Sequence, residues 1–332
     1  MWGARGRYVL NRLVHGLPII FAIVVVNFFL IRLAPGDAAQ VLAGEAGSAS
    51  EQYIAQIRQQ FGLDQPLYVQ FFSYFKNILL LDLGFSFRHG RTVASLIVER
   101  LGATALLMVA AMVVSVGAGM LLGAIAAIRE RTIVGNLIVT FAIVSYATPL
   151  FWVGLMLIIV FSINLGWFPT SGFETVGANY TGFRHALDVA HHLVLPAVTL
   201  SFFHMALYTR LMRSSMIETL GLDFIKTVRA KGVGERQIIV KHALRNAILP
   251  VLTMIGVQVS GMIGGSVVVE SVFGWPGLGL LAYESLFARD FNLLLGIFFL
   301  SSVLVVATNA VVDVVYTIVD PRIALKGGRA HG

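Results

Sequence analysis

The side chains that could do chemistry gather in one charged stretch, residues 223–250, which lies between two apolar runs. The stretch holds six lysine or arginine residues, although only 12% of the whole chain is charged. It opens at Asp223, is broken by glycine at Gly232 and Gly234, and continues as a second helical pattern from Glu235. An exposed helix that mixes basic and apolar residues is typical of a segment that docks into a groove. We therefore expect a docking surface for a partner in the aqueous phase.

Other kinds of chemistry have no support in the sequence. A G-x-x-x-x-G-K-[ST] phosphate loop is absent, and Gly232-Val233-Gly234 is too short to be a dinucleotide fingerprint. The chain has no cysteine, which excludes disulfides, thiolate metal sites and thiol catalysis. His191-His192 has no H-E-x-x-H pattern or carboxylate pair beside it, so interfacial packing is favoured over a metal site. No Ser–His–Asp arrangement is visible. The sequence predicts neither an enzyme nor a resident cofactor or metal.

A second group of polar residues lies inside apolar runs. Asp313 is an acid within the last run, and acids inside a membrane are costly and often functional. A structural hydrogen bond near the interface and a role in conduction or gating both stay open for it. Gln258 and Ser260 are polar residues in a glycine-rich run, which favours a cavity-facing side. The candidates for a pathway or gate are therefore Gln258, Ser260, Gly261 and Asp313.

The elements that must position these residues are membrane helices. The 332 residues are 57% hydrophobic with a mean hydropathy of +0.83, far more apolar than a soluble domain, which carries about 25% charged residues. A bilayer offers no partner to backbone N–H and C=O groups, so the spans must be helices of about 20 residues. We predict an all-α integral membrane protein with six spans near residues 10–33, 101–128, 134–163, 193–215, 248–270 and 292–319.

Charge placement gives the predicted orientation. A seventh apolar run at 67–83 contains polar residues and many aromatics, so we read it as a helix lying in the interface. With six spans, one side receives 16 of the 24 basic residues and only five of the 17 acids. The positive-inside rule makes that side cytoplasmic, with both termini there. The same rule explains the pI near 9.9 without a nucleic-acid partner. We read the first run as a retained span, not as a cleaved signal.

This topology divides the chain into four parts. Residues 1–33 hold the N-terminus and first span, and residues 34–100 form a long extracytoplasmic loop with interfacial helices. Residues 101–319 form the transmembrane core, which contains the cytoplasmic segment 217–247, and residues 320–332 form a cytoplasmic tail. Further outer segments are expected at 164–192 and 271–291.

The charged segment itself is expected to be two helices. A short helix over 224–231 follows Asp223 and is closed by Gly232, whose turn needs a positive φ. A second helix runs from Glu235 into the fifth span. In that helix Ile238, Ile239 and Ala243 would face the membrane base, while Arg236 and Lys241 would face water.

At these residues the chain resembles the permeases of ABC importers, in the dipeptide/oligopeptide/nickel branch. The resemblance starts in the coupling loop, which reads Arg229-Ala230-Lys231-Gly232, then His242-Ala243-Leu244-Arg245-Asn246-Ala247 and Pro250. Lys226-Thr227-Val228 stands where sugar importers have E-A-A, as is usual in the peptide branch, although Val228 replaces a common alanine. Matches elsewhere, in order along nearly the whole chain, are Leu33-Ala34-Pro35-Gly36-Asp37, Gly62-Leu63-Asp64-Gln65-Pro66-Leu67, Asp82-Leu83-Gly84, Arg213-Ser214-Ser215-Met216, Phe273-Gly274-Trp275-Pro276-Gly277-Leu278-Gly279 and Asp320-Pro321-Arg322.

The resemblance implies a type I importer permease in a bacterial cytoplasmic (inner) membrane. The long loop after the first span is similar to that of the first, B-type permease of the pair. The implied partners are a second homologous permease, two cytoplasmic ATPases that carry ATP and Mg, an extracytoplasmic substrate-binding protein and the lipid bilayer. The implied ATPase-coupling residues are Asp223, Phe224, Thr227, Arg229, Ala230, Lys231, Gly232, Glu235, Arg236, His242, Arg245 and Asn246.

The substrate stays open at this point. The branch handles dipeptides, oligopeptides, glutathione, nickel chelates, opines and haem, and peptides are the default by family frequency. Two other classes of function remain as alternatives. One is a secondary transporter driven by an ion gradient, which would need charges and broken helices at the midplane. The other is a membrane-anchored structural or assembly subunit.

Overall fold

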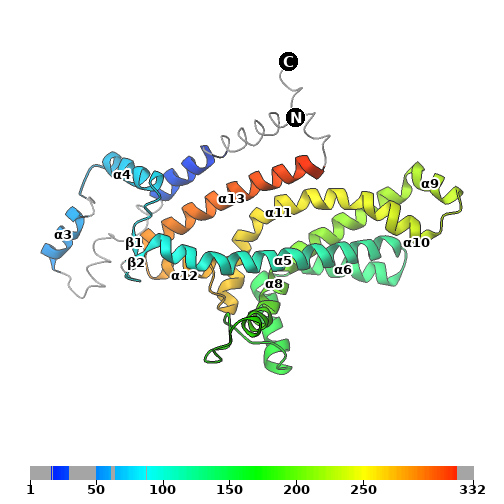
Figure 1. Ribbon diagram of the computed structural model, residues 1–332, viewed down its shortest axis with the longest axis horizontal. Coiled ribbons are helices and arrows are strands. Elements are labelled where there is room, and N and C mark those ends of the chain that lie inside the picture. The colour runs from blue at the N-terminus through cyan, green and yellow to red at the C-terminus, as the bar shows by residue number, and fades with distance from the viewer. Residues whose placement is uncertain (1–15, 17, 30–49, 61–63, 87, 320–332) are drawn as a thin grey trace, which may run out of the picture. The chain divides into compact units, whose positions relative to one another are not determined.

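The computed structural model describes residues 16, 18–29, 50–60, 64–86 and 88–319, and it is mostly helical there (Figure 1). For residues 311–319 and a few others, Ser260 among them, it describes the backbone alone. The N-terminal arginines, the start of the long loop and the tail 320–332 lie outside the described residues. The helices after the first apolar helix, Pro18–Phe29, are α3 (Glu51–Gln60), α4 (Leu67–Leu79), α5 (Val93–Ile128), α6 (Ile133–Ala147), α7 (Leu150–Leu157), α8 (Phe183–Gly221), α9 (Asp223–Ala230), α10 (Glu235–Gln237), α11 (Leu244–Phe273), α12 (Leu278–Phe287) and α13 (Phe291–Val319).

Two π-helical segments interrupt this α-helical pattern, and the sequence did not predict them. The first is η1 (Ile158–Asn164), which continues α7, and the second is η2 (Ile238–Ala243), which joins α10 to α11. A π-helix is rare and occurs mostly as short bulges, often at functional sites. The second one lies inside the predicted docking segment.

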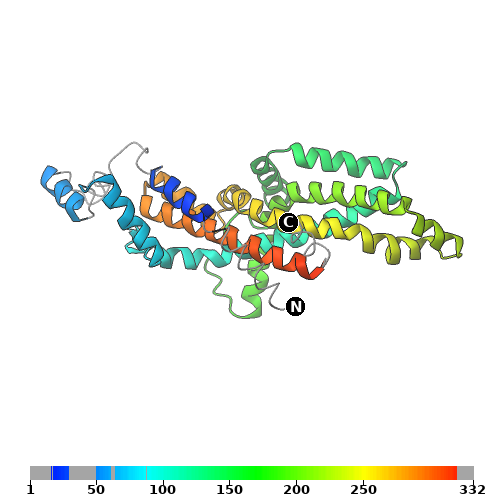
Figure 2. The same cartoon turned by 90° about the horizontal axis from the view of Figure 1, so that it is seen from above.

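The chain folds as two compact units, each with its own packing. The second unit centres on Ala103–Leu280, and there α8 runs alongside α6 and α11, with α7 packed on both α8 and α11 (Figure 2). One buried cluster of this unit includes Leu107, Leu200 and Phe273, and another includes Tyr208 and Met212. In the first unit, Val24, Ile78 and Phe299 form a smaller buried cluster.

The predicted span 134–163 is broken in the structure. Helices α6 and α7 meet at Thr148 and Pro149, and the helix formed by α7 and η1 is bent by 109° from α6. Thr148 is extended, with φ −83° and ψ 131°, because the ring of a following proline disfavours the α conformation. The predicted run is therefore a bent pair of helices and not one continuous helix, and the Thr-Pro pair in the sequence marks the break.

Among the residues that the structure describes, four helices are long and apolar enough to cross a membrane, and up to six if each of two bent pairs counts as one span. The four are Val93–Ile128, Phe183–Gly221, Glu235–Val259 and Phe291–Ala310. One bent pair is α6 with α7 and η1, and the other joins Gly261–Phe273 to α12. The run at 67–83 forms α4, which is not among these candidates. Six spans thus remain a prediction, while a multi-helix apolar architecture is observed.

Two predicted loops hold more structure than expected. The segment 271–291, which was expected to lie outside the membrane, contains the ten-residue helix α12. In the first loop, the strands β1 (Phe85–Ser86) and β2 (Arg91–Thr92) form an antiparallel hairpin that the sequence did not predict. Its register pairs Phe85 with Thr92. Hairpins this short carry little pattern of their own, so tertiary contacts decide whether they form.

Candidate functional site

The charged segment folds as two short helices joined by a tight turn. Helix α9 ends at Ala230, and Gly232 adopts φ +77°, the left-handed region that glycine enters without steric cost. The second helix starts at Glu235 after an extended Gly234. The predicted helix–turn–helix, with its glycine turn at Gly232, is therefore confirmed.

The start of α9 differs from the prediction in one detail. Asp223 was expected to precede the helix, but Leu222 occupies the cap position and makes no side-chain cap hydrogen bond. Asp223 is the first helical residue, and its Oδ1 lies 2.7 Å from Nζ of Lys226. A carboxylate in the first turn still favours the helix through the macrodipole, which explains why an acid stands there.

Apolar anchors hold the two helices on the helices beneath them. Ile225 of α9 and Ile238 of η2 are both fully buried, in one cluster with Tyr208, Met212 and Met216 of α8. Ala243 and Val251 belong to the same cluster. Of the residues expected to face the membrane base, Ile238 and Ala243 are buried in this cluster and Ile239 is half-buried against it. The segment is thus preorganised, because each short helix inserts a large side chain into a packed core.

The opposite side of the segment is exposed and combines charge with apolar surface. Phe224 is 40% exposed and Val240 58% exposed, and Lys231 and Arg236 are exposed between them in the chain. A groove beside α10 is lined by Gly234, Glu235, Arg236, Gln237, Val240 and Lys241. Such a surface can bind a partner through both ionic and apolar contacts.

One ion pair spans the turn. Nη2 of Arg229 donates a hydrogen bond of 2.7 Å to Oε1 of Glu235, and Nε donates one of 3.2 Å to Oε2. These hydrogen bonds, and the negative charge of Glu235, raise the pKa of the Arg229 guanidinium. The pair therefore links the end of α9 to the start of α10 on the exposed side.

The predicted coupling residues all lie on this one element. Nearly all are exposed on α9, the turn or α10: Asp223, Phe224, Thr227, Arg229, Ala230, Lys231, Gly232, Glu235 and Arg236. Farther along, His242 is half-buried in η2, and Arg245 and Asn246 are exposed in α11. Asn246 Nδ2 donates to the carbonyl of His242 at 2.7 Å. The structure therefore brings the predicted coupling residues together on one segment of the chain.

The predicted pathway residues are placed less fully. Gln258 is half-buried and Gly261 exposed on α11. Ser260 lies on the same helix and Asp313 on α13, but their side chains lie outside the described residues. The prediction missed Glu270, a fully buried acid in α11. The signal for it was an acid within the apolar run Ser266–Phe273, next to the end of a predicted span.

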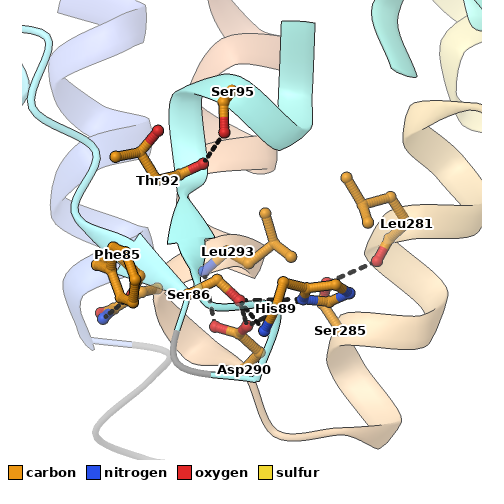
Figure 3. A network of polar contacts seen from close by, with 10 residues as sticks. Phe85, Ser86, His89, Thr92, Ser95, Leu281, Ser285, Asp290 and Leu293 are labelled. Atoms are coloured by element: carbon orange, nitrogen blue, oxygen red, sulfur yellow. Dashed lines mark hydrogen bonds and ion pairs between the residues drawn. The ribbon is translucent and has the colours of Figure 1, made fainter. Parts of the chain in front are cut away.

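The structure also assembles a serine, a histidine and an aspartate that the sequence did not reveal. Ser86 Oγ lies 3.0 Å from His89 Nδ1 and donates a hydrogen bond to Asp290 Oδ2 (Figure 3). In a hydrolytic triad the acid orients the histidine, which lies between acid and serine. Here the serine is central and fully buried. The arrangement fastens the β1–β2 hairpin to the turn before α13 and does not form a nucleophile.

Each residue of the histidine pair lies within hydrogen-bonding distance of a backbone carbonyl. His191 Nε2 lies 2.8 Å from the carbonyl of Trp167, and His192 Nδ1 lies 2.9 Å from the carbonyl of Asp188. Within the part of the chain that the structure describes, no group of three or more His, Cys, Asp or Glu residues could hold a metal ion.

Comparison with known families matches both halves of the chain. Residues 119–325 match the family described as the binding-protein-dependent transport system inner membrane component. Residues 6–108 match the N-terminal family of membrane components of the same systems. The first match includes the whole of the segment 217–247.

Individual relatives resemble the chain over nearly its full length. The oligopeptide transport system permease protein AppB of Bacillus subtilis is 40% identical over 317 residues, which cover 95% of this chain and 98% of the relative. The glutathione transport system permease protein GsiC of Escherichia coli K12 is 40% identical over 319 residues, with 96% and 99% covered. A putative peptide permease of Brucella suis is 37% identical over 318 residues, with 96% and 98% covered.

These matches decide between the classes of function. Two of these relatives are named as permeases of transport systems and the third as a putative peptide permease, and the family is described as the inner membrane component of binding-protein-dependent transport systems. This favours a permease of an ABC importer over a carrier driven by an ion gradient, and a multi-pass inner-membrane protein over an enzyme. The motifs of the peptide/nickel branch and the apolar helices agree with this result. The chain belongs to the family of binding-protein-dependent transport system inner membrane components.

Proposed function

We propose that the chain forms half of the translocation pathway of an importer for peptides or a peptide-like solute. It crosses the membrane six times with both termini in the cytoplasm, and a second homologous permease forms the other half. Two cytoplasmic ATPases bind ATP and Mg, and an extracytoplasmic binding protein delivers the solute. The relatives named for oligopeptides and glutathione support this substrate class. The long first loop makes it the first, B-type permease of the pair.

The observation that carries the proposal is the preorganised segment 217–247. Its helices α9 and η2 are anchored by the buried Ile225 and Ile238, while Phe224, Arg236 and Val240 are exposed on it. Preorganisation lowers the entropic cost of binding, so this surface suits a partner that must bind and transmit force. The exposed residues named above as coupling residues would contact the ATPases.

Force would pass from the ATPases to the spans through this element. ATP-driven closure of the ATPases displaces α9, α10 and η2 as one lever, because α9 and η2 are both packed on α8. The helix that begins at Glu235 continues through η2 into α11, so displacement at α10 reaches the region of Gln258 and Gly261. The pathway then alternates between inward and outward access as the two states are stabilised in turn.

Reconstitution in vesicles tests the proposal. The chain is combined with its companion permease, the two ATPases and the binding protein, and uptake of a di- or tripeptide is measured with and without ATP. We expect uptake only with ATP and binding protein present. Uptake by the two permeases alone, driven by a proton or sodium gradient, would overturn the proposal.

The substrate class is tested separately. Mass spectrometry of the ligand that copurifies with the companion binding protein should identify a short peptide or glutathione-like molecule. A nickel chelate, an opine or haem in that site would replace peptides as the substrate while leaving the ATP-driven importer intact.

A further inference from the structure

A buried carboxylate in α11 has no part in the function described above. Glu270 is fully buried, and no lysine, arginine or histidine among the described residues forms an ion pair with it. Its partners are neutral donors: Oγ1 of Thr104 donates to Oε1 at 2.8 Å, and the backbone N–H of Leu280 donates to Oε2 at 3.0 Å. A buried carboxylate is tolerated when such donors replace its hydration.

The donors come from separate parts of the second unit. Thr104 lies on α5, and Leu280 lies in the first turn of α12. The Thr104 hydroxyl also accepts a hydrogen bond of 2.7 Å from the N–H of Leu278, the first residue of α12. Glu270 and Thr104 together therefore satisfy N–H groups that the start of α12 cannot pair within the helix. The carboxylate also lies where the positive end of that helix favours an anion.

The loop between α11 and α12 is packed directly onto this carboxylate. A Cβ on Gly277 would overlap the carboxylate of Glu270, and one on Gly279 would lie 2.5 Å from Cα of Val267. Only glycine fits at such distances. The fully buried Trp275 fills the space beside them, and its Nε1 donates to the carbonyl of Ala103 at 2.9 Å.

We propose that Glu270 is a positioning residue for transport, which holds the end of α11, the loop 274–280 and the adjoining part of α5 together as one rigid element. We call this element the Glu270 clamp and define it by Ala103, Thr104, Glu270, Trp275, Leu278 and Leu280. Alternating access moves packed elements as rigid bodies. The clamp makes its three segments move together, so that displacement of α11 carries the start of α12 and α5 with it.

A matched pair of substitutions at Thr104 tests the clamp. Thr104→Val keeps the shape of the side chain but removes the hydroxyl, which takes one donor from Glu270 Oε1 and the acceptor from the Leu278 N–H. Thr104→Ser keeps the hydroxyl. Because hydrogen bonds to charged groups are strong and buried unpaired groups are costly, we expect the valine variant to transport at least about tenfold less solute per ATP hydrolysed. The serine variant should stay within about twofold of the parent chain.

The readouts separate positioning from misfolding and from the proposed function. Copurification of the ATPases and ATP hydrolysis without binding protein should be unchanged in both variants, since the clamp lies away from α9 and α10 in the sequence. Equal transport by the valine and serine variants would overturn the inference. The inference uses the proposed ATP-driven uptake only as its assay. A parent complex without ATP-driven uptake would count against the proposed function. In that case the effect of a disulfide between residues 171 and 274 would be measured on the ATP hydrolysis that the binding protein stimulates.

A disulfide beside the clamp gives a second test that does not depend on the folding of the valine variant. A Cβ built on Gly274 lies 3.7 Å from Cβ of Ser171, within the range that disulfides require, and the chain has no cysteine of its own. The Gly172 N–H already donates to the carbonyl of Phe273 at 2.9 Å, so residues 171 and 172 are held to the end of α11 and belong to the proposed rigid element together with the clamp. We compare transport by the double variant Ser171→Cys/Gly274→Cys before and after reduction of the disulfide. Both states carry the same substitution at Gly274, so the difference reports the disulfide alone. Equal transport in both states is expected. Transport that stops on oxidation and returns on reduction would show that this junction opens, and would overturn the rigid element.

Discussion

Arg229 and Glu235 form a two-point ion pair across the Gly232 turn, with hydrogen bonds of 2.7 and 3.2 Å. Both side chains are about half-exposed, at 51% and 57%. Exposed pairs add little to the overall stability of a protein because water and salt screen them. The consequence of this pair is local: it fixes the angle between α9 and α10 on the side where a partner would bind.

Charge reversal should show this local effect. We expect Arg229→Glu or Glu235→Arg alone to loosen the turn and lower the amount of solute transported per ATP hydrolysed. The double variant Arg229→Glu/Glu235→Arg should restore part of the coupling, because the attraction returns with its direction reversed. Hydrogen exchange of the amides over 223–237 measures the turn directly.

Lys226→Ala provides the control for that series. Lys226 pairs with Asp223 inside α9, at 2.7 Å, and this pair does not cross the turn. Its loss should leave amide exchange at the Gly232 turn unchanged. A change equal to that of Arg229→Glu would mean that total charge, not the link across the turn, sets the coupling.

Substitutions of the two glycines near the turn should differ sharply. Gly232→Ala places a side chain at φ +77°, which costs about 1–2 kcal/mol for an L-residue, although the space around it is open. Gly234→Ala has the same open surroundings but an ordinary φ of −64°. We expect Gly232→Ala to reduce coupled transport and Gly234→Ala to retain it. Comparable losses of coupled transport in both alanine variants would show that the backbone conformation at Gly232 is not the cause of the loss. Gly232→Pro should abolish coupling while the chain still inserts in the membrane.

The features of residues 223–250 that the sequence predicts are those that depend on neighbouring residues in the chain. A glycine where φ must be positive, and a charged helix with buried isoleucines, both follow from spacing along the chain. The break at Thr148-Pro149 also has a local cause, since proline constrains the residue before it. The span over 134–163 was predicted from the length of its apolar run, without the bend that Pro149 causes.

The unpredicted features depend on contacts between distant residues. The donor Thr104 lies 166 positions from Glu270, so nothing near either residue indicates the pair. Ser86 and Asp290 are 204 positions apart, and their contact stabilises a hairpin of two-residue strands. The π-helix η2 likewise follows from how Ile238 and Ala243 both enter the same buried cluster, which spacing alone does not specify.

The buried and exposed sides of α9 should respond differently to truncation. Ile225→Ala removes a fully buried side chain and should destabilise the chain by about 2–5 kcal/mol. Phe224→Ala removes a neighbouring side chain that is 40% exposed, and its effect on stability should be small. Thermal unfolding of the purified permease measures the first effect. Phe224→Ala should instead weaken ATPase copurification, because an exposed aromatic is a typical anchor of an interface. Normal ATPase binding in that variant would place the partner surface elsewhere.

The predicted topology can be tested by single cysteines, since the chain has none. Val176, which is 98% exposed, lies in the segment expected outside the membrane, and Lys226 lies in the segment expected in the cytoplasm. A membrane-impermeant thiol reagent added to intact spheroplasts should label Val176→Cys and leave Lys226→Cys unlabelled. Permeabilised cells should label both, which controls for the reactivity of the second site. Labelling of Lys226→Cys in intact spheroplasts would place α9 outside the cytoplasm, where no ATPase could reach it.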